Sequence, residues 1–284
     1  PAFIKHLYMA LLHPKALDTV VAIGKPQPNN KKRWIGTGFL YGLLNESSED
    51  GKKSYRVFLV TNKHVLRNLT SIFLKFNPQN DQASIDFPIK IKKDDGTNAW
   101  FGHPDAKVDV AVLAINLDIM VKHGAKFEFI RSDGNAFVTS ELMEAGISEG
   151  DSVYALGFPM GIVDTDRQYV IVRQGCIARI RDLYEKRKTD FLCDVMVFPG
   201  NSGGPVFIKP DVASVTGSKP NQKSGLIGIV KGYIPYKDVA VSQQTQRPRI
   251  TFEENSGLTA IEPVDHIHTT IEGYVKAQEA QKKS

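Results

Sequence analysis

Short apolar runs separated by polar turns recur along most of the chain, and this pattern is typical of β-strands. In the first half, strands are expected at residues 19–23, 34–44, 55–61, 71–76, 85–91 and 108–115. In the second half, they are expected at residues 152–157, 168–180, 190–197, 205–209 and 226–233. This succession predicts an all-β protein with two groups of strands.

Helical spacing of apolar residues occurs only near the two ends of the chain. Apolar positions ahead of Pro14 fall on one helical face, which predicts a short N-terminal helix within residues 1–17. A frayed tail is the alternative for that segment. From Val264 onward the spacing is again helical, so a C-terminal helix is expected, with a frayed polar tail after Ala277.

Polar segments rich in Pro, Gly, Ser and Asn mark the connections between strands. Loops are expected at residues 25–33, 45–53, 210–224 and 236–256, and residues 116–150 are expected to cross from one group of strands to the other. The segment 236–256 is unusually long, and residues 248–252 are expected to form a hairpin of their own.

Composition excludes some classes of partner. The apolar fraction of 42%, the charged fraction of 24% and the net charge of +5 are those of an ordinary globular protein of 284 residues. Basic residues gather at 31–33 and 179–188, which we interpret as solvated loops because no nucleic-acid-binding motif accompanies them. No apolar stretch is long enough to span a membrane, and no signal-peptide core is evident. We therefore expect neither a nucleic-acid nor a membrane partner.

The two cysteines, Cys176 and Cys193, lie in apolar runs and are interpreted as small buried hydrophobic residues, with a bridge or metal site as the weaker alternative. So few cysteines favour a reducing, cytoplasmic location. His103, His266 and His268 are not at ligand spacing from a cysteine or an acid, so no metal and no cofactor is expected.

One segment has the composition of a nucleophile turn. In residues 198–206, Phe-Pro-Gly-Asn-Ser-Gly-Gly-Pro-Val, Ser202 lies among glycines ahead of an apolar run. Glycine allows a tight turn in which backbone N–H groups point at a ligand, and a hydroxyl becomes nucleophilic beside a base. Taken alone, the same letters also fit a glycine-rich connection between strands.

Two further segments supply the missing groups. His64 follows the apolar run 58–61, and Asp109 begins the run 108–113. Either residue alone is explained as a core histidine or a turn aspartate. The order His64, Asp109, Ser202 is that of chymotrypsin-type enzymes and differs from that of subtilisins and α/β-hydrolases.

These segments resemble the trypsin-like serine proteases, and most closely the HtrA-type branch. The resemblance extends in patches over about residues 34–268, as at residues 36–40, 153–161, 224–230 and 257–263. It implies two six-stranded antiparallel β-barrels of the chymotrypsin type in a single peptidase domain. The implied boundaries are a first barrel at 18–125, a crossover at 126–150, a second barrel at 151–263 and a helix with tail at 264–284. Since the chain ends at Ser284, no PDZ domain is expected.

The resemblance also implies a role for each site residue. His64 is the general base, Asp109 orients it, and Ser202 is the nucleophile. The oxyanion hole lies in the segment Gly200, Asn201 and Ser202, with the N–H groups of Gly200 and Ser202 as its donors.

The implied specificity pocket is formed by two segments. One wall comes from Met196, Val197 and Phe198, and the other from Ile229, Val230 and Lys231. Met196 at the base of such a pocket argues against Arg or Lys and favours a medium-sized apolar side chain before the cleaved bond.

Asn201 stands where digestive trypsin-like enzymes carry the aspartate that pairs with a new N-terminal ammonium. We therefore expect no zymogen cleavage, and expect the loops 158–168, 181–189 and 236–256 to order Gly200. A mobile loop of this kind can be biased by a partner. The expected partners are a protein or peptide substrate and a protein regulator. The alternative function is that of a protease-like binding module or pseudo-enzyme with a closed site.

Overall fold

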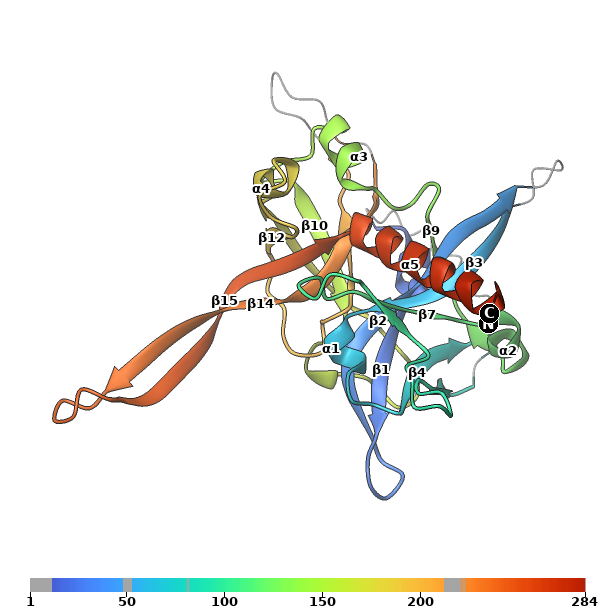
Figure 1. Ribbon diagram of the computed structural model, residues 1–284, viewed down its shortest axis with the longest axis horizontal. Coiled ribbons are helices and arrows are strands. Elements are labelled where there is room, and N and C mark those ends of the chain that lie inside the picture. The colour runs from blue at the N-terminus through green and yellow to red at the C-terminus, as the bar shows by residue number, and fades with distance from the viewer. Residues whose placement is uncertain (1–11, 48–52, 81, 212–220, 222, 284) are drawn as a thin grey trace, which may run out of the picture.

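The computed structural model describes residues 12–47, 53–80, 82–211, 221 and 223–283. Two β-sheets lie side by side, and a long C-terminal helix lies across one face of them (Figure 1). The N-terminal helix predicted within residues 1–17 lies mostly outside the described residues. What is described there is a 3₁₀-helix, η1, at Pro14–Thr19.

The first sheet has nine strands, of which seven pair in the order β5-β4-β1-β2-β3-β7-β6. Their bounds are β1 Val20–Pro26, β2 Lys32–Ser47, β3 Lys53–Thr61, β4 Ser71–Pro78, β5 Ile85–Lys90, β6 Phe101–Gly102 and β7 Ala111–Ala114. Two short strands, β8 Ala125–Lys126 and β9 Ile130–Arg131, pair with β4 and β2. The predicted strands in this half are therefore all present, with shifted ends.

The closed six-stranded barrel expected in this half is not shown by the strand pairing. The pairing order has β5 at one end and β6 at the other, and no described pairing joins them. The predicted strand 108–115 is regular only at Ala111–Ala114, because Asp109 is used by side-chain hydrogen bonds instead of a ladder.

The central strands of this sheet are buried on both faces, which explains their continuous apolar runs. In β1, Val21 and Ile23 pack in a core within the first half, whereas Val20 and Ala22 face a second core shared with the other half and the C-terminal helix.

The second sheet is a closed six-stranded barrel in the order β10-β11-β12-β15-β14-β13, as predicted. The bounds are β10 Ser152–Gly157, β11 Ile171–Arg179, β12 Phe191–Asp194, β13 Pro205–Ile208, β14 Gly225–Val241 and β15 Pro248–Pro263. Closure follows because β10 pairs with both β11 and β13. Inward residues such as Val153, Ile177 and Val206 fill the interior.

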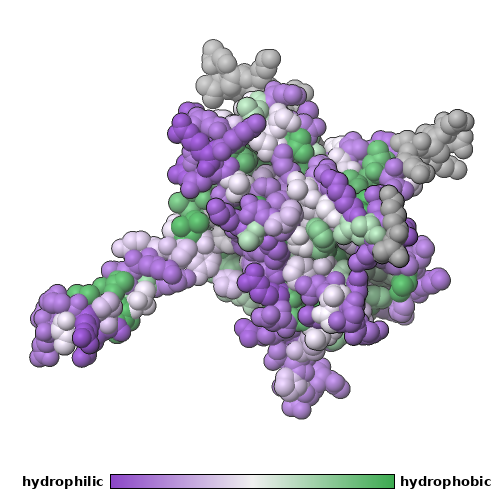
Figure 2. All heavy atoms as spheres, in the orientation of Figure 1, coloured by the Kyte–Doolittle hydropathy of each residue, from purple (hydrophilic) through white to green (hydrophobic). Residues whose placement is uncertain are grey.

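β14 and β15 continue well beyond the barrel as a two-stranded ribbon (Figure 1). Their pairing extends to Val241 and Pro248, so residues 248–252 form one strand of this ribbon and not a separate hairpin as expected. Apolar side chains remain on its surface, among them Tyr236, Ile250 and Phe252, each more than half exposed (Figure 2).

Helices connect and cover the sheets. They are α1 Lys63–Leu66, α2 Leu117–Lys122, α3 Thr139–Glu144, η2 Pro159–Gly161, α4 Arg181–Tyr184 and α5 Val264–Lys283. α5 packs Val264, Ile267 and Ile271 into the core between the halves. It runs on through the tail expected to fray after Ala277, because Ala, Gln, Glu and Lys there are good helix formers.

Cys176 and Cys193 lie on the paired strands β11 and β12, and both thiols are free. Cys193 is buried, and burial raises the pKa of its thiol, whereas Cys176 is half-buried. Within the described part of the chain, no helix combines the length and apolar character needed to cross a membrane.

Candidate active site

His64 and Asp109 meet at the edge of the first sheet. α1, a four-residue helix, starts right after β3 and places His64 at its second position. One carboxylate oxygen of Asp109 lies 2.5 Å from His64 Nδ1, and the other accepts the backbone N–H of His64 at 3.1 Å. Because Asp109 can only accept when ionised, Nδ1 carries the proton and Nε2 is left as the acceptor.

Asp109 itself is fixed from both sides of its backbone. Its carbonyl accepts the Asn62 amide at 2.7 Å, and its N–H donates to Glu262 at 2.9 Å. Burial raises the pKa of Asp109, but the hydrogen bond and charge of His64 outweigh burial, so the net pKa lies below its ordinary value. Asp109 is therefore ionised at neutral pH.

Glu262 is a fully buried carboxylate beneath Asp109. Besides the Asp109 N–H, it accepts from Lys231 Nζ at 2.9 Å and faces His266 Nδ1 at 2.7 Å. Lys231 also contacts Asp190 at 3.2 Å. Burial raises the pKa of Glu262, but these three donors together hold it below its ordinary value.

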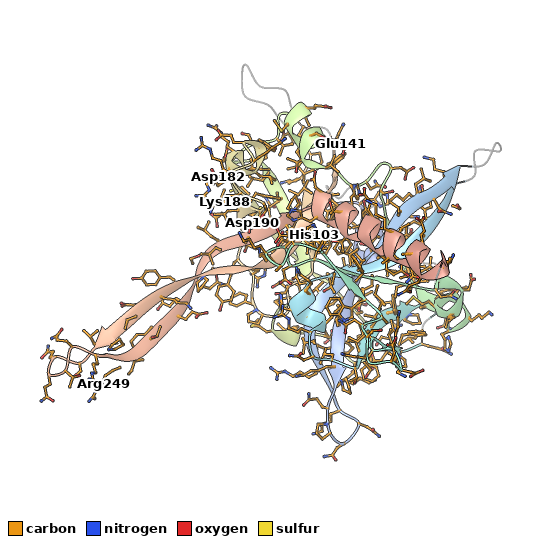
Figure 3. The ribbon with its side chains drawn as sticks, viewed as in Figure 1. His103, Glu141, Asp182, Lys188, Asp190 and Arg249 are labelled. Carbon is orange, nitrogen blue, oxygen red and sulfur yellow. The ribbon has the colours of Figure 1, made fainter. Side chains whose placement is uncertain are left out.

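We call Glu262, Lys231, Asp190 and His266 the support network. The His266 ring also contacts the His103 ring in a tilted arrangement, with ring centroids 5.1 Å apart; Asp190 and His103 are labelled in Figure 3. The sequence analysis missed the network, although one signal was available. Glu262 is a lone charge in an apolar run, and burying a charge requires partners.

The loop that carries Ser202 contacts β2 and the end of β3, the strand that precedes His64. The backbone N–H of Thr37 in β2 donates to the Ser202 carbonyl at 2.9 Å. At Gly203, which has a positive φ of 85°, a Cβ atom would lie 2.2 Å from both the Thr37 carbonyl and the Thr61 hydroxyl. Only glycine allows this close approach of the second half to the first.

The backbone N–H groups of Gly200 and Ser202 have their directions fixed by the peptide units to which they belong. Met160 N–H holds the Pro199 carbonyl at 2.6 Å, and Gly204 N–H holds the Asn201 carbonyl at 2.9 Å. Because a trans peptide unit is planar, the N–H on its other side points the opposite way, here at Gly200 and Ser202. Neither N–H donates to any acceptor in the described residues.

Thr37 is a second residue that sequence analysis did not single out. Its buried hydroxyl donates to the Gly200 carbonyl at 2.6 Å and accepts the Phe158 N–H at 3.0 Å. The Gly200 carbonyl is thus held inward. Asn201 was included with the oxyanion residues, but its N–H donates to the Phe198 carbonyl at 2.9 Å and is not available.

Ser202 is the least constrained member of the site. Its hydroxyl donates to the Lys231 carbonyl over a long 3.4 Å, and within the described residues it makes no hydrogen bond to His64. The loops that carry the three residues expected as a triad are thus in contact, but only His64 and Asp109 are hydrogen-bonded to each other.

The expected specificity segments are divided between core and surface. Val197, Ile229 and Val230 are buried among core residues, so a substrate could meet only their backbone. Met196 is 43% exposed and faces outward. Lys231 directs its ammonium toward the support network and not toward a pocket.

Among the described residues, no cluster of three or more His, Cys, Asp or Glu side chains has the arrangement of a metal site. The hydrogen-bonded His64 and Asp109, the weakly held Ser202 hydroxyl and the unpaired N–H groups of Gly200 and Ser202 form a site that can transfer a proton and bind a developing anion.

Comparison with known proteins identifies the family. Two solved structures, both described as inactive forms, are similar to this chain. The Rv3671c protease is 16% identical over 91% of this chain and 89% of its own, with a TM-score of 0.42. A serine-to-alanine mutant of Rv3671c from M. tuberculosis H37Rv is 14% identical over 90% and 87%, with the same TM-score. No curated protein matches. The model of the trypsin-like peptidase domain matches residues 36–211, more than half of the chain, which therefore belongs to that family.

Proposed function

We propose that this protein is a serine endopeptidase that hydrolyses peptide bonds through an acyl-enzyme on Ser202. The observation that carries the proposal is the two-point contact of Asp109 with His64, beside a serine whose neighbouring N–H groups at Gly200 and Ser202 are unoccupied. Family membership supports the same reaction class.

In the proposed reaction, Ser202 Oγ attacks the carbonyl carbon of the scissile bond while its proton passes to His64 Nε2. The resulting oxyanion accepts hydrogen bonds from the N–H groups of Gly200 and Ser202. The C–N bond then breaks, and His64 gives its proton to the leaving amine. Water, deprotonated by His64, hydrolyses the acyl ester and regenerates the hydroxyl. Asp109 stabilises the imidazolium throughout without taking its proton.

The second candidate is a protease-like binding module, and the orientation of Ser202 toward the Lys231 carbonyl favours it. Two considerations favour the enzyme. Hydrogen bonds between nucleophile and base are often long or unmade before substrate binds. The N–H groups of Gly200 and Ser202, which donate to no acceptor in the described residues, also support an oxyanion hole that can receive a ligand, whereas a closed site is the premise of the pseudo-enzyme.

Covalent labelling separates the two candidates. A fluorophosphonate probe phosphonylates a serine only when base and oxyanion hole are both in place, so we expect labelling of the wild type. Ser202→Ala should abolish labelling, and the exposed Ser140→Ala serves as the matched control that retains it. A folded wild type that is not labelled would overturn the enzyme in favour of the binding module.

Three finer features belong to the same proposal. We infer a preference for a medium-sized apolar residue before the cleaved bond, supported by Met196. We infer regulation by a protein partner through loop 158–168, since Met160 N–H holds the Pro199 carbonyl next to Gly200. A cytoplasmic location is supported by two thiols that remain free although they lie on adjacent strands.

A further inference from the structure

We propose that a cavity beside Gly200 is a carboxylate-binding subsite for the part of the substrate that follows the cleaved bond. The inference rests on the proposed peptidase function and names a substrate class for it. It predicts that peptides carrying a carboxylate shortly after the scissile bond are preferred over neutral ones.

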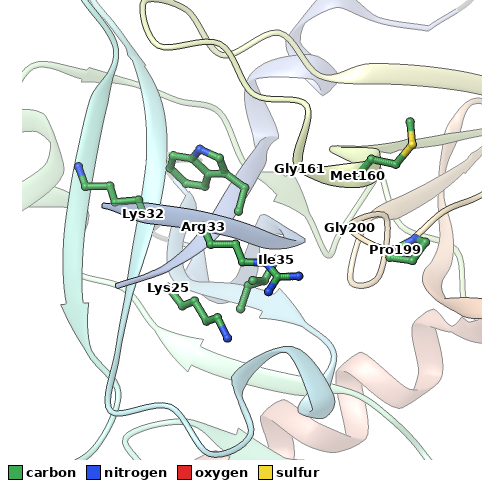
Figure 4. Close-up of a pocket in the computed structure, with 9 residues that line it drawn as sticks. Lys25, Lys32, Arg33, Ile35, Met160, Gly161, Pro199 and Gly200 are labelled. Carbon is green, nitrogen blue, oxygen red and sulfur yellow. The ribbon is translucent and has the colours of Figure 1, made fainter. Parts of the chain in front are cut away.

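The cavity has a volume of about 560 Å³ and is lined by nine residues (Figure 4). Trp34, Ile35 and Met160 give it apolar walls, and Gly200 lies at one side. Three cations also line it, and no acidic residue does. A cavity with apolar walls and cationic groups suits a short aliphatic stem that ends in an anion.

Two of the cations are placed in a way that costs stability unless an anion joins them. Lys25 in β1 and Arg33 in β2 are directly opposed in the antiparallel register. Like charges directly opposite each other on a sheet repel. Within the described residues, neither side chain has an ion-pair or hydrogen-bond partner.

The third cation, Lys32, differs from the other two because it has an anionic partner within the protein. Lys32 forms an ion pair with Asp86 at 2.6 Å and lies over the Phe73 ring. This partner is shared, because Asp86 also pairs with Lys75 at 2.9 Å. Lys25 and Arg33 are the cavity cations without an anionic partner in the described residues, and these two residues are the proposed ligands of the carboxylate.

The place of the cavity decides which part of a substrate reaches it. The acyl part is expected to lie along residues 196–198 and 229–231, none of which lines the cavity. The cavity instead adjoins Gly200 and Pro199 (Figure 4). The chain that leaves with the amine passes on this side.

A carboxylate there has two sources, and their chemistry is the same. One is the side chain of a glutamate in the substrate, whose methylene groups match the apolar walls. The other is the C-terminal carboxylate of a peptide that ends shortly after the cleaved bond. Both would be held by charge-assisted hydrogen bonds from guanidinium and ammonium.

The test uses the full chain and a series of labelled peptides with one common acyl part. In one set of peptides, all with an amidated C-terminus, Glu replaces Gln at each of the first three positions after the scissile bond in turn. In a second set, Gln peptides end at each of these positions with a free C-terminal carboxylate. Affinity for the Ser202→Ala variant and kcat/KM of the wild type are both measured. We expect the preferred carboxylate peptide to exceed its neutral partner by about fivefold, and less at high salt. If the Glu peptide is preferred over the peptide with a free C-terminus, the carboxylate comes from a side chain. If the order is reversed, it is the terminal carboxylate.

Arg33→Gln and Lys25→Gln should each reduce the preference for the carboxylate, whereas Lys31→Gln, in the same hairpin but outside the cavity lining, should retain it. Equal affinity for charged and neutral peptides at all three positions overturns the inference, and so does a preference that survives Arg33→Gln combined with Lys25→Gln. Because affinity is read on Ser202→Ala, these outcomes are decisive even if no peptide is cleaved. The proposed function fails separately, by absence of fluorophosphonate labelling.

Discussion

The two sides of the candidate site differ in how firmly the protein holds them. On the acid–base side, Asp109 and His64 share two hydrogen bonds, and Asp109 is anchored again by Asn62 and Glu262. On the nucleophile side, the backbone around Ser202 is fixed, but its hydroxyl has one hydrogen bond of 3.4 Å. The comparison teaches that the His64 ring is held in place by the protein itself, whereas the Ser202 hydroxyl is left free to turn, as the proposed reaction requires.

The largest effect is expected when the hydrogen bond between Asp109 and His64 is disrupted. Asp109→Asn replaces an oxygen that accepts from His64 Nδ1 with an amide that donates, which favours the wrong imidazole tautomer. We expect turnover to fall by up to about 10⁴-fold with the fold intact, as measured by peptide cleavage and thermal unfolding. Asp105→Asn, at an exposed position of the same loop, is the control and should remain active. Loss of less than tenfold in Asp109→Asn would mean that the pair does not serve catalysis.

The next effect tests whether the support network stabilises the firm side. Glu262→Gln removes the buried charge that pairs with Lys231 and lies 2.7 Å from His266 Nδ1, and we expect a loss of about 3 kcal/mol at pH 7. The exposed Glu254→Gln, on the ribbon, is the matched control and should change little. Denaturant unfolding gives both values.

The pH dependence of this difference has a defined sign. The folded-state pKa values of Glu262 and Asp109 are lowered, so their contribution is full above the unfolded carboxyl pKa of about 4 and is lost as pH falls through the folded values. The gap between wild type and Glu262→Gln should therefore be constant from pH 8 to about 5 and shrink in more acidic solution. A gap that widens on acidification contradicts this assignment.

A smaller effect is expected on the nucleophile side, at Asn201. Its side chain is fully buried; Oδ1 accepts the Phe198 N–H at 3.0 Å, and Nδ2 has no partner in the described residues. No described cation is hydrogen-bonded or ion-paired to the Asn201 side chain, so Asn201→Asp would bury a charge without an ion-pair partner. We expect a loss of about 2 kcal/mol at pH 8, with Asn135→Asp as the exposed control.

Here the sign is opposite to that at Glu262. Burial raises the folded-state pKa of the new carboxyl above its unfolded value of about 4. The loss of stability is therefore absent below about pH 4 and grows as pH rises from there toward the raised folded-state pKa. Unfolding of variant and wild type at pH 5 and pH 8 measures it. A variant as stable as wild type at pH 8 would point to a cation that pairs with this position, as in zymogen-derived enzymes.

The sequence predicted the parts of this site that are local in the chain. Apolar runs located β1 to β4, and glycines located the turn at Ser202, because both signals lie within a few residues. The support network could not be predicted in the same way, since Asp109 and Glu262 are 153 positions apart and meet only through the fold. Likewise, strand patterns do not reveal that β5 and β6 end the first sheet without pairing.

The smallest effect is expected from changes in the ribbon of β14 and β15, which makes far fewer contacts with the candidate site than the support network does. It was expected to help order Gly200, yet beyond Lys237 its residues make no described contact with the nucleophile loop. Only its base does so, where the Asn255 amide donates to the Val197 carbonyl at 2.6 Å. The comparison predicts that the tip is dispensable and the base is not.

Replacing residues 238–252 by Asn-Gly joins the paired residues Lys237 and Glu253 through a turn that two strands readily accept. Because the removed side chains are largely exposed, we expect stability to change by less than about 1 kcal/mol and the rate of fluorophosphonate labelling at Ser202 to stay within about twofold, the smallest change among these variants. Asn255→Ala, the matched change at the base, frees the Val197 carbonyl next to Phe198 and should lower both quantities more. A tenfold drop in labelling on removal of the tip would show that the ribbon orders the oxyanion hole directly. Unchanged labelling leaves the loops 158–168 and 181–189 as the elements expected to order Gly200, and of these it is 158–168 that contacts Pro199, through the Met160 N–H.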